Sequence, residues 1–357
     1  MAKLSSEIKP VIRSIDVGFG YTKYSTEEEG ELQYKSFPSI APRSSKIENS
    51  DLSMINERDT IIVTVDGTVY EVGPDSLLLE TSDTTRTLND QYIHTAQYKA
   101  LTYGALAYMN EKVIDLLVVG LPVSNYESHH EALKRHLVGE HKINDRLICT
   151  IKNVLVVYQP LGGLTHCMSL ANTTLANHDL ESSMNLIIDP GFLTVDFLLA
   201  NGNKIIENKS GAHNGGVSRI LNAIADSITK KIGKKYENYN AIDKALKKRK
   251  LKIAGKEEDL LEHIKNTKSV IESPITYMKN MIGDGSDIDN IILLGGGANI
   301  FEKTLKENFK DREIIVIEDP SFANVRGYQI IGVANYKKLL KSISDAIEAK
   351  EAKEDIE

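Results

Sequence analysis

A short sequence pattern occurs twice in this chain, once in each half. The first copy spans Ile15–Phe19 and reads Ile-Asp-Val-Gly-Phe; the second spans Ile188–Phe192 and reads Ile-Asp-Pro-Gly-Phe. In each copy an apolar run leads into the aspartate, and a second β-prone run follows the turn. That arrangement predicts a β-hairpin with an acid and a glycine in its bend. One such turn is common, but two in matching halves predict two related domains that face each other.

Short β-prone runs alternate with segments of helical periodicity along the rest of the chain. The Asp66-Gly67 pair between two β-prone runs marks a further hairpin. Strands that alternate with helices predict an α/β fold whose sheets are covered by helices. We expect strands within 61–65, 68–72, 116–119, 148–157, 291–294 and 314–317, and helices within 96–109, 127–138, 161–177, 217–232 and 325–340.

Charge and composition exclude several classes of protein. Of 357 residues, 43 are Lys or Arg and 50 are Asp or Glu, which gives a net charge of −7. Proteins that grip duplex DNA usually carry a basic field, so we expect no direct binding to nucleic acid. No apolar run approaches the roughly 20 residues of a membrane span, and the N-terminus is polar; we expect a cytoplasmic protein without membrane contact. Cys149 and Cys167 show no CxxC spacing, which predicts two buried, inert thiols.

Glycine-bearing turns follow three of the expected strands, at Asp16, at Asp189 and at Gly295, and a glycine pair opens the helix at Val217. Glycine lets backbone N–H groups approach a phosphate, and a helix N-terminus adds a favourable dipole. The P-loop pattern GxxxxGK[ST] and the Rossmann pattern GxGxxG are both absent. Each loop alone is either a structural turn or a phosphate loop. Their order along the chain favours a nucleotide site of another architecture.

The ordered set of motifs resembles the superfamily of actins, heat-shock chaperones and sugar kinases. Within that superfamily, Gly120–Val123 and Phe322–Tyr328 are similar to the ParM/StbA plasmid-partition actins and to related archaeal and phage actins. The resemblance covers about Ser14 to Tyr336. Its motifs are Asp16–Lys23, Gln159 after a strand, Asp189–Gly191, Gly215-Gly216, Gly295–Ala298 and Asn324–Gly327.

The resemblance implies an actin-like ATPase fold with two related lobes. Each lobe would have a mixed β-sheet flanked by helices, with a nucleotide in the cleft between the lobes. We assign residues 1–180 to lobe I, with a small subdomain inserted at about 34–88. Residues 181–340 form lobe II, with a subdomain inserted at about 217–285, and the charged residues 341–357 form a flexible tail.

The resemblance also implies metal and catalytic roles. Asp16 and Asp189, one from each lobe, would hold Mg²⁺ through waters, because Mg²⁺ keeps most of its waters in proteins. Gln159 would orient the attacking water, with Asp189 assisting, since phosphoryl transfer needs mostly positioning and charge stabilisation. On the alternative interpretation, the two aspartates are plain turn residues and Gln159 is only a cap or turn residue.

The implied nucleotide contacts come from four loops. The first turn would hold the β- and γ-phosphates of ATP or GTP through its backbone, with the Lys23 charge beside them, and the second turn would clasp the same phosphates. The loop that starts at Gly295 would line the base and ribose, and the glycine pair before Val217 would lie near the sugar. The residues concerned are Gly18, Phe19, Gly20, Thr22 and Lys23; Gly191, Phe192, Leu193 and Thr194; Gly215 and Gly216; and Gly295, Gly296, Gly297 and Ala298.

The second turn and Gln159 depart from the pattern of the family. Pro190 removes a backbone donor from the second turn, and the bulky Phe192 and Leu193 follow it. Gln159 is a neutral amide, which can orient water but is a poor base. We therefore expect slow turnover unless assembly improves the geometry.

The function implied by the resemblance is a filament-forming ATPase that segregates or positions plasmid or phage DNA. Its partners would be further copies of itself and a DNA-bound adaptor protein, with ATP-dependent assembly and hydrolysis-triggered disassembly. The alternative is a small-molecule kinase or phosphatase of the same fold, for which the sequence shows no clear acceptor site. Lys230–Lys256 holds eleven Lys or Arg residues; it is either a solvated helical face or a contact surface for an acidic neighbour.

Overall fold

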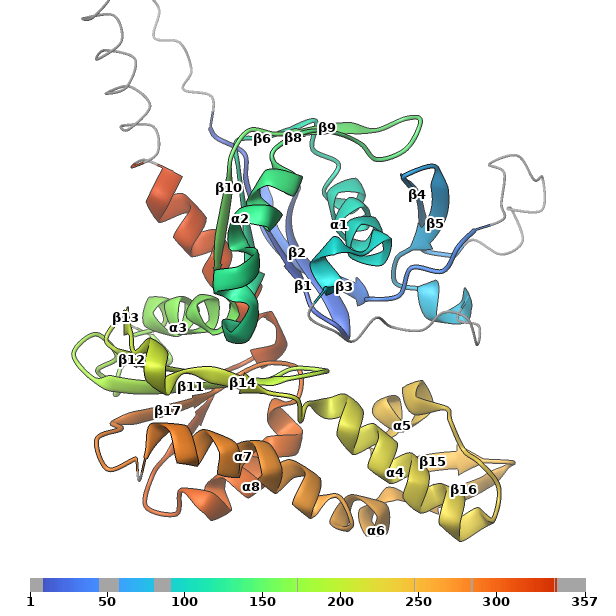
Figure 1. The fold of residues 1–357 in the computed structure, drawn as a ribbon, viewed down its shortest axis with the longest axis vertical. Helices are drawn as coiled ribbons and strands as arrows, with labels where there is room; N and C mark the ends of the chain where they lie inside the picture. The colour runs from blue at the N-terminus through green and yellow to red at the C-terminus, as the bar shows by residue number, and fades with distance from the viewer. Residues whose placement is uncertain are drawn as a thin grey trace, which may run out of the picture. The chain divides into compact units, whose positions relative to one another are not determined.

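The computed structural model describes residues 9–44, 58–79 and 91–336, without residues 172, 247 and 284, and also residue 338. These residues form two compact units, each drawn in Figure 1. The first unit comprises the chain up to Leu121, then Asn125–His166 and the residues from Asn324 on. The second comprises Pro122–Ser124 and Cys167–Ala323.

The first unit is a five-stranded mixed sheet in the order β10-β7-β1-β2-β3. Strand β1 (Ile12–Val17) pairs antiparallel with β2 (Tyr21–Glu28), which pairs antiparallel with β3 (Glu31–Pro38). On its other side, β1 pairs parallel with β7 (Leu116–Leu121), and β7 pairs parallel with β10 (Val154–Tyr158). The repeated pattern at Asp16 therefore forms the predicted hairpin.

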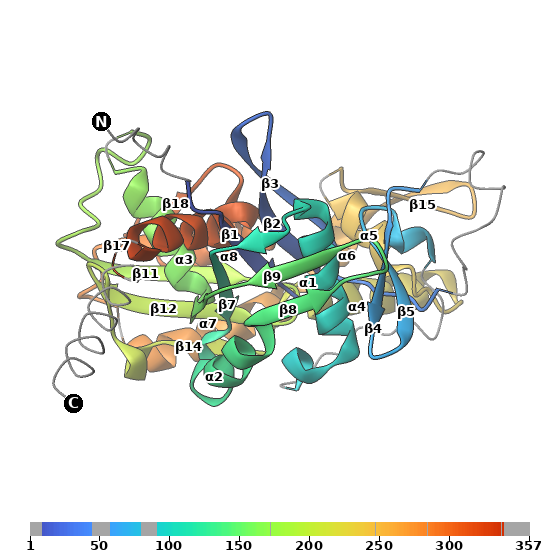
Figure 2. The same cartoon turned by 90° about the horizontal axis from the view of Figure 1, so that it is seen from above.

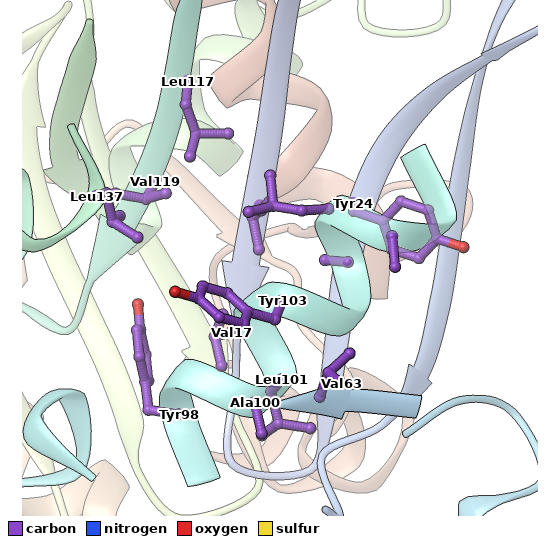
Figure 3. Close-up of a cluster of buried hydrophobic side chains, with 14 of the residues drawn as sticks. Val17, Tyr24, Val63, Tyr98, Ala100, Leu101, Tyr103, Leu117, Val119 and Leu137 are labelled. Atoms are coloured by element: carbon purple, nitrogen blue, oxygen red, sulfur yellow. The ribbon is translucent and has the colours of Figure 1, made fainter. Parts of the chain in front are cut away.

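Alternation along these strands separates two apolar layers. Leu117 and Val119 of β7 face a core shared with α1 (Ala96–Met109) and α2 (Tyr126–Leu137), part of which Figure 3 shows around Val17, Leu101 and Tyr103. Leu116 and Val118 belong to the opposite layer, which the helix over 323–336 covers through Tyr328. A strand buried on both faces explains why β7 is apolar throughout.

Smaller elements complete the first unit. Asp66 and Gly67, both with positive φ, join the predicted hairpin β4–β5. The β-prone run at 148–157 is divided between two strands, and the helix expected over 161–177 is shorter and begins earlier, as α3. The remaining bounds are β4 (Ile61–Val65), β5 (Thr68–Val72), β6 (Val113–Ile114), β8 (Gly139–Lys142), β9 (Ile148–Ile151), α3 (Gln159–Ser169), η2 (Ser76–Leu79) and η3 (Tyr92–His94).

The second unit repeats the strand order and directions of the first. Its sheet runs β13-β12-β11-β17-β18, and a further strand, β14, pairs with β12; Figure 2 shows β11, β12 and β14 side by side. Strand β11 (Met184–Pro190) forms an antiparallel hairpin with β12 (Val195–Asn201) and pairs parallel with β17 (Asn290–Leu293). Strand β17 then pairs parallel with β18 (Ile314–Val316). The prediction of an α/β fold with two related mixed sheets is confirmed.

Helices cover the sheet of the second unit, and an insertion extends from it. The core joins Leu186 and Ile188 of β11 to apolar side chains of α4, α7 and α8. The bounds are α4 (Val217–Ile232), α5 (Tyr239–Leu246), β15 (Lys250–Ile253), β16 (Lys256–Asp259), α6 (Leu260–Lys265), α7 (Lys268–Ile282), α8 (Ala298–Asn308), β13 (Lys204–Ile205), β14 (Gly211–His213), η4 (Val123–Asn125, which begins in this unit), η5 (Glu207–Lys209) and η6 (Pro320–Phe322).

The units divide the chain differently from the expected lobes in three places, the first being Pro122–Ser124, which belongs to the second unit. Residues 167–180 belong to the second unit, and the residues from Asn324 on belong to the first. The final helix belongs to the first unit because Tyr328 and Ile331 pack against Ile12, Leu116 and Val118 of that sheet. The expected tail at 341–357 and part of the insertion at 34–88 lie outside the described residues. Among the residues that are described, no helix combines the length and the apolar character needed to cross a bilayer.

Candidate functional site

The first acidic turn joins β1 to β2. The N–H of Gly18 donates to the Tyr21 carbonyl at 3.2 Å and closes the turn. Ser39 holds it from the side, since its hydroxyl donates to the Gly18 carbonyl at 2.5 Å and its N–H to the Gly20 carbonyl at 2.9 Å. The N–H of Gly18, expected at a phosphate, is therefore already engaged inside the turn.

Side chains of this turn fall into two groups. Thr22 is fully buried and its hydroxyl lies 3.0 Å from that of Ser39, so it braces the hairpin. Phe19 stacks on Tyr92 of η3 with ring centroids 4.6 Å apart, which anchors the turn to a neighbouring segment. Lys23, opposite Asp16 in the strand register, points to that aspartate instead, with Nζ 3.2 Å from Oδ2.

Asp16 and Gln159 come together although 143 residues separate them in the chain. Gln159 is the first residue of α3, directly after β10, and its Nε2 donates to Asp16 Oδ1 at 3.0 Å. Asp16 is only 2% exposed, and its two oxygens accept from Lys23 and from Gln159. The structure thus assembles a buried carboxylate, an ammonium and an amide at one end of the sheet.

The second acidic turn repeats the closure of the first. The N–H of Gly191 donates to the Thr194 carbonyl at 2.8 Å, as Gly18 does to Tyr21. Asp189 is 8% exposed and lies opposite Asp196 in the register of β11 and β12. Pro190 is the last residue of β11, and its carbonyl accepts a hydrogen bond from Gly297 N at 2.8 Å.

Asp196 is a buried acid that the sequence analysis missed. Its Oδ2 accepts from the Thr194 hydroxyl at 2.6 Å and its Oδ1 from Val123 N at 3.1 Å. Thr194 is therefore tied to the strand that follows the turn. An aspartate between Val195 and Phe197, in a run of otherwise buried strand residues, is the signal that could have revealed it.

The glycine pair before α4 supports the second turn. Three successive N–H groups, of Gly216, Val217 and Ser218, donate to the carbonyls of Leu193, Gly191 and Phe192 at 2.8–3.0 Å. A Cβ on Gly216 would lie less than 3.0 Å from these carbonyl groups, so only glycine fits. Gly215 packs beside His213 and Pro274. The start of α4 therefore binds the second turn through its backbone N–H groups.

The third glycine loop lies against Asp189. Gly295 has φ +83°, and a Cβ there would come within 3.0 Å of Asp189 Oδ1. A Cβ on Gly297 would lie 2.8 Å from the Pro190 carbonyl oxygen, whereas a Cβ on Gly296 would meet nothing within 4 Å. Ala298 is buried in the core at the start of α8. The structure thus brings Asp189 and this loop together, with Gly296 as its open residue.

The aspartates that precede the glycine turns occur singly, Asp16 in the first unit and Asp189 in the second. Among the described residues, no group of three or more His, Cys, Asp or Glu side chains could hold a metal ion. Each unit instead offers a nearly buried aspartate beside a glycine turn. Mg²⁺ commonly binds through one or two carboxylates, phosphate oxygens and several waters.

Comparisons with known proteins identify the family. A model of the actin-like protein N-terminal domain matches residues 14–162, and one of the C-terminal domain of archaeal MreB-like actin homologues matches residues 187–307. The chain belongs to the actin-like proteins. No curated protein sequence matches it significantly.

Solved structures of similar fold are actin-like over nearly the full chain. The archaeal actin homologue Ta0583 has 19% identity and a TM-score of 0.74, covering 91% of this chain and 99% of that one. A 15-stranded ParM filament from Clostridium botulinum has 21% identity and a TM-score of 0.70 (92% and 100% covered). The apo pSK41 ParM protein has 23% identity and a TM-score of 0.60 (92% and 98% covered).

The two cysteines take no part in these turns, and we expect them to be unreactive in the folded protein. Burial raises the pKa of Cys149 to about 11 and that of Cys167 to about 12, and the thiolate is the reactive form. At pH 8 the native protein should release almost no chromophore from a disulfide reagent such as DTNB. The same protein in urea should react at both thiols, and rapid reaction of the native form would contradict the expectation.

Proposed function

We propose that this chain is a nucleotide-hydrolysing, filament-forming actin-like protein that segregates or positions plasmid or phage DNA through a DNA-bound adaptor. The observation that carries the proposal is the contact of Gln159 with Asp16 beside a glycine turn. That arrangement provides an amide able to orient water next to an acid able to hold hydrated metal. The paired turns of the two units and the actin-like fold support it.

Each unit would contribute one acidic turn to binding a nucleoside triphosphate, ATP or GTP. Bound Mg²⁺ would neutralise developing charge on the phosphates. Asp16 and Asp189 would accept hydrogen bonds from its waters, and Lys23 would exchange its contact with Asp16 for a phosphate oxygen. The backbone at Phe19 and Gly20 and the open Gly296 would lie against the ligand.

Hydrolysis would depend on Gln159. Its amide can donate to one group and accept a hydrogen bond from a water, but it cannot take a proton efficiently near neutral pH. The protein would therefore orient the water without strongly activating it. Slow turnover in the free protein and faster turnover after assembly follow from this chemistry.

The neighbours in fold suggest assembly. One is described as a ParM filament of 15 strands, another as a ParM mutant that cannot polymerise, and Ta0583 has also been solved with ADP. A homopolymer that binds nucleotide is therefore the proposal for this chain, with the DNA adaptor as a second partner.

Sedimentation separates the proposal from its alternative. We expect the protein to pellet at high speed with Mg²⁺ and ATP or GTP and to remain in the supernatant with the diphosphate, because the triphosphate form assembles. Phosphate release should accompany pelleting. Absence of pelleting, together with phosphoryl transfer to a sugar or an acid, would favour a small-molecule kinase.

Gln159→Ala should keep nucleotide binding and assembly but slow phosphate release about 10²-fold, because the water loses its orienting group. Single-turnover phosphate release and nucleotide affinity measure the two effects separately. Gln33→Ala, at an exposed position of β3, is the matched control and should behave as the native protein. Loss of nucleotide binding in the Gln159 variant would show that its role is misassigned.

The basic segment 230–256 is the proposed contact surface for an acidic neighbouring protomer. Lys231, Lys235 and Lys250 form ion pairs with local glutamates, whereas among the described residues Lys248 and Lys252 are exposed and have no ion-pair partner. The whole chain carries a net charge of −7 despite this segment, so the rest of a second copy is strongly acidic. Opposite charges on two copies would favour their association, and added salt would weaken this attraction.

Replacing Lys248, Arg249 and Lys252 with Glu should raise the critical concentration for assembly about tenfold. The effect is modest because exposed ion pairs each contribute little binding energy. A matched triple reversal of Lys204, Lys303 and Lys310, exposed residues elsewhere in the second unit, serves as the control. Pelleting across a concentration series measures both. An unchanged critical concentration in the first variant would refute a protomer contact at this surface.

A further inference from the structure

Tyr328 occupies a space that two glycines, Gly120 and Gly162, leave open. It lies on the helix over 323–336, is 0% exposed and is among the largest fully buried side chains of the protein. A Cβ on Gly120, at the end of β7, would lie less than 3.0 Å from Tyr328 Oη. A Cβ on Gly162 of α3 would collide with Tyr328 Cε1 in the same way. The ring is therefore wedged between the sheet and α3.

The side chain of Gln159 borders the same space beside Gly120. The position of a Cβ on Gly120 is 3.0 Å from Gln159 Cγ, so the phenol and the stem of Gln159 share the surface of one glycine. Gln159 lies one helical turn before Gly162, which the ring also contacts. The ring thus limits where the first turn of α3 and the Gln159 stem can lie.

Hydrogen bonds fix the helix that carries Tyr328 to the strand that carries Asp16. The Ser14 hydroxyl donates to the Val325 carbonyl at 2.9 Å, and Gln329 Nε2 donates to the Ile12 carbonyl at 2.9 Å. The Ser25 hydroxyl, on β2, donates to Gln329 Oε1 at 2.9 Å. Gly327 brings this helix into backbone contact with Gly162 of α3. Tyr328 is therefore held in a constant position relative to both Asp16 and Gln159.

We propose that Tyr328, seated on Gly120, is a positioning residue that holds the Gln159 amide against Asp16. It touches no reacting atom and acts through Gln159. The inference rests on the proposed hydrolytic role of Gln159 for its consequence, but the placement of the Gln159 side chain is testable without nucleotide. We call the contact of the Tyr328 ring with Gly120 the seat. It requires glycine at position 120, because any side chain there would displace the Tyr328 ring, the Gln159 side chain or both.

Gly120→Ala tests the seat. We expect nucleotide affinity within about threefold of the native value but phosphate release lower by about 10²-fold, the loss typical of a displacement near 1 Å at a reacting group. In nucleotide-free protein, the side-chain amide resonance of Gln159, assigned by its loss in Gln159→Ala, should shift because its hydrogen bond to Asp16 is disturbed. That resonance reports placement independently of activity.

Two further variants keep the test decisive. Gly332→Ala is the matched control: its Cβ would also lie less than 3.0 Å from Ile12 and Val118 on the same helix–sheet contact, but it does not touch Gln159. It should lower thermal stability while the Gln159 resonance and the turnover per folded molecule stay unchanged. Tyr328→Leu removes the ring that limits the Gln159 stem, and it should shift the same resonance and lower phosphate release in the same direction as Gly120→Ala, even if Gly120→Ala alone folds poorly.

The outcomes separate this inference from the proposed function. A folded Gly120→Ala protein with native resonance and native turnover would overturn the seat, as would equal losses in the Gly332→Ala control. A folded Tyr328→Leu protein with native Gln159 resonance and native turnover would overturn it too. If the native protein hydrolyses no nucleotide, the proposed function fails, whereas the resonance shift still decides whether Tyr328 and Gly120 place Gln159.

Discussion

The fold of the first unit depends on supplying one buried carboxylate with a cation and hydrogen-bond donors. Asp16 lies at the end of β1 almost without solvent contact, and a carboxylate removed from water costs several kcal/mol unless it is paired and hydrogen-bonded. Lys23 supplies a cation from the adjacent strand and Gln159 an amide from α3. Because the donors come from different elements, β2 and α3 must both keep their places relative to β1. The requirement that stabilises the fold is therefore the same one that arranges the candidate hydrolytic group.

The second unit supports its acidic turn by a different physical means. The carbonyls of Gly191, Phe192 and Leu193 accept from the N–H groups at the start of α4, which satisfies donors that a helix end otherwise leaves open. Side chains do the equivalent work in the first unit, through Ser39 and Phe19. The two related turns thus share their closing hydrogen bond but not their support. One is fixed by side-chain contacts and the other by a helix terminus.

Local patterns predicted the parts of this structure that local interactions determine. Both acidic hairpins and the Asp66-Gly67 turn follow from residues close together in sequence. The return of the last helix to the first sheet and the partner of Asp196 could not be predicted in that way. Each depends on contacts between segments far apart in the chain, such as Gln329 with Ile12 and Asp196 with Val123. Periodicity shows that a helix is amphipathic, but not which sheet its apolar face covers.

The glycines show most clearly why the site could not be fully predicted from the sequence alone. A glycine after a strand suggests a turn or a phosphate loop, and Gly295, with its positive φ, is consistent with that interpretation. Gly120, Gly162, Gly216 and Gly327 have no positive φ, and what they provide is the space of a missing Cβ. Their partners, a tyrosine ring or a backbone carbonyl, lie elsewhere in the sequence. The geometry of such a site cannot be predicted from sequence patterns, because it depends on which distant residue packs against each glycine.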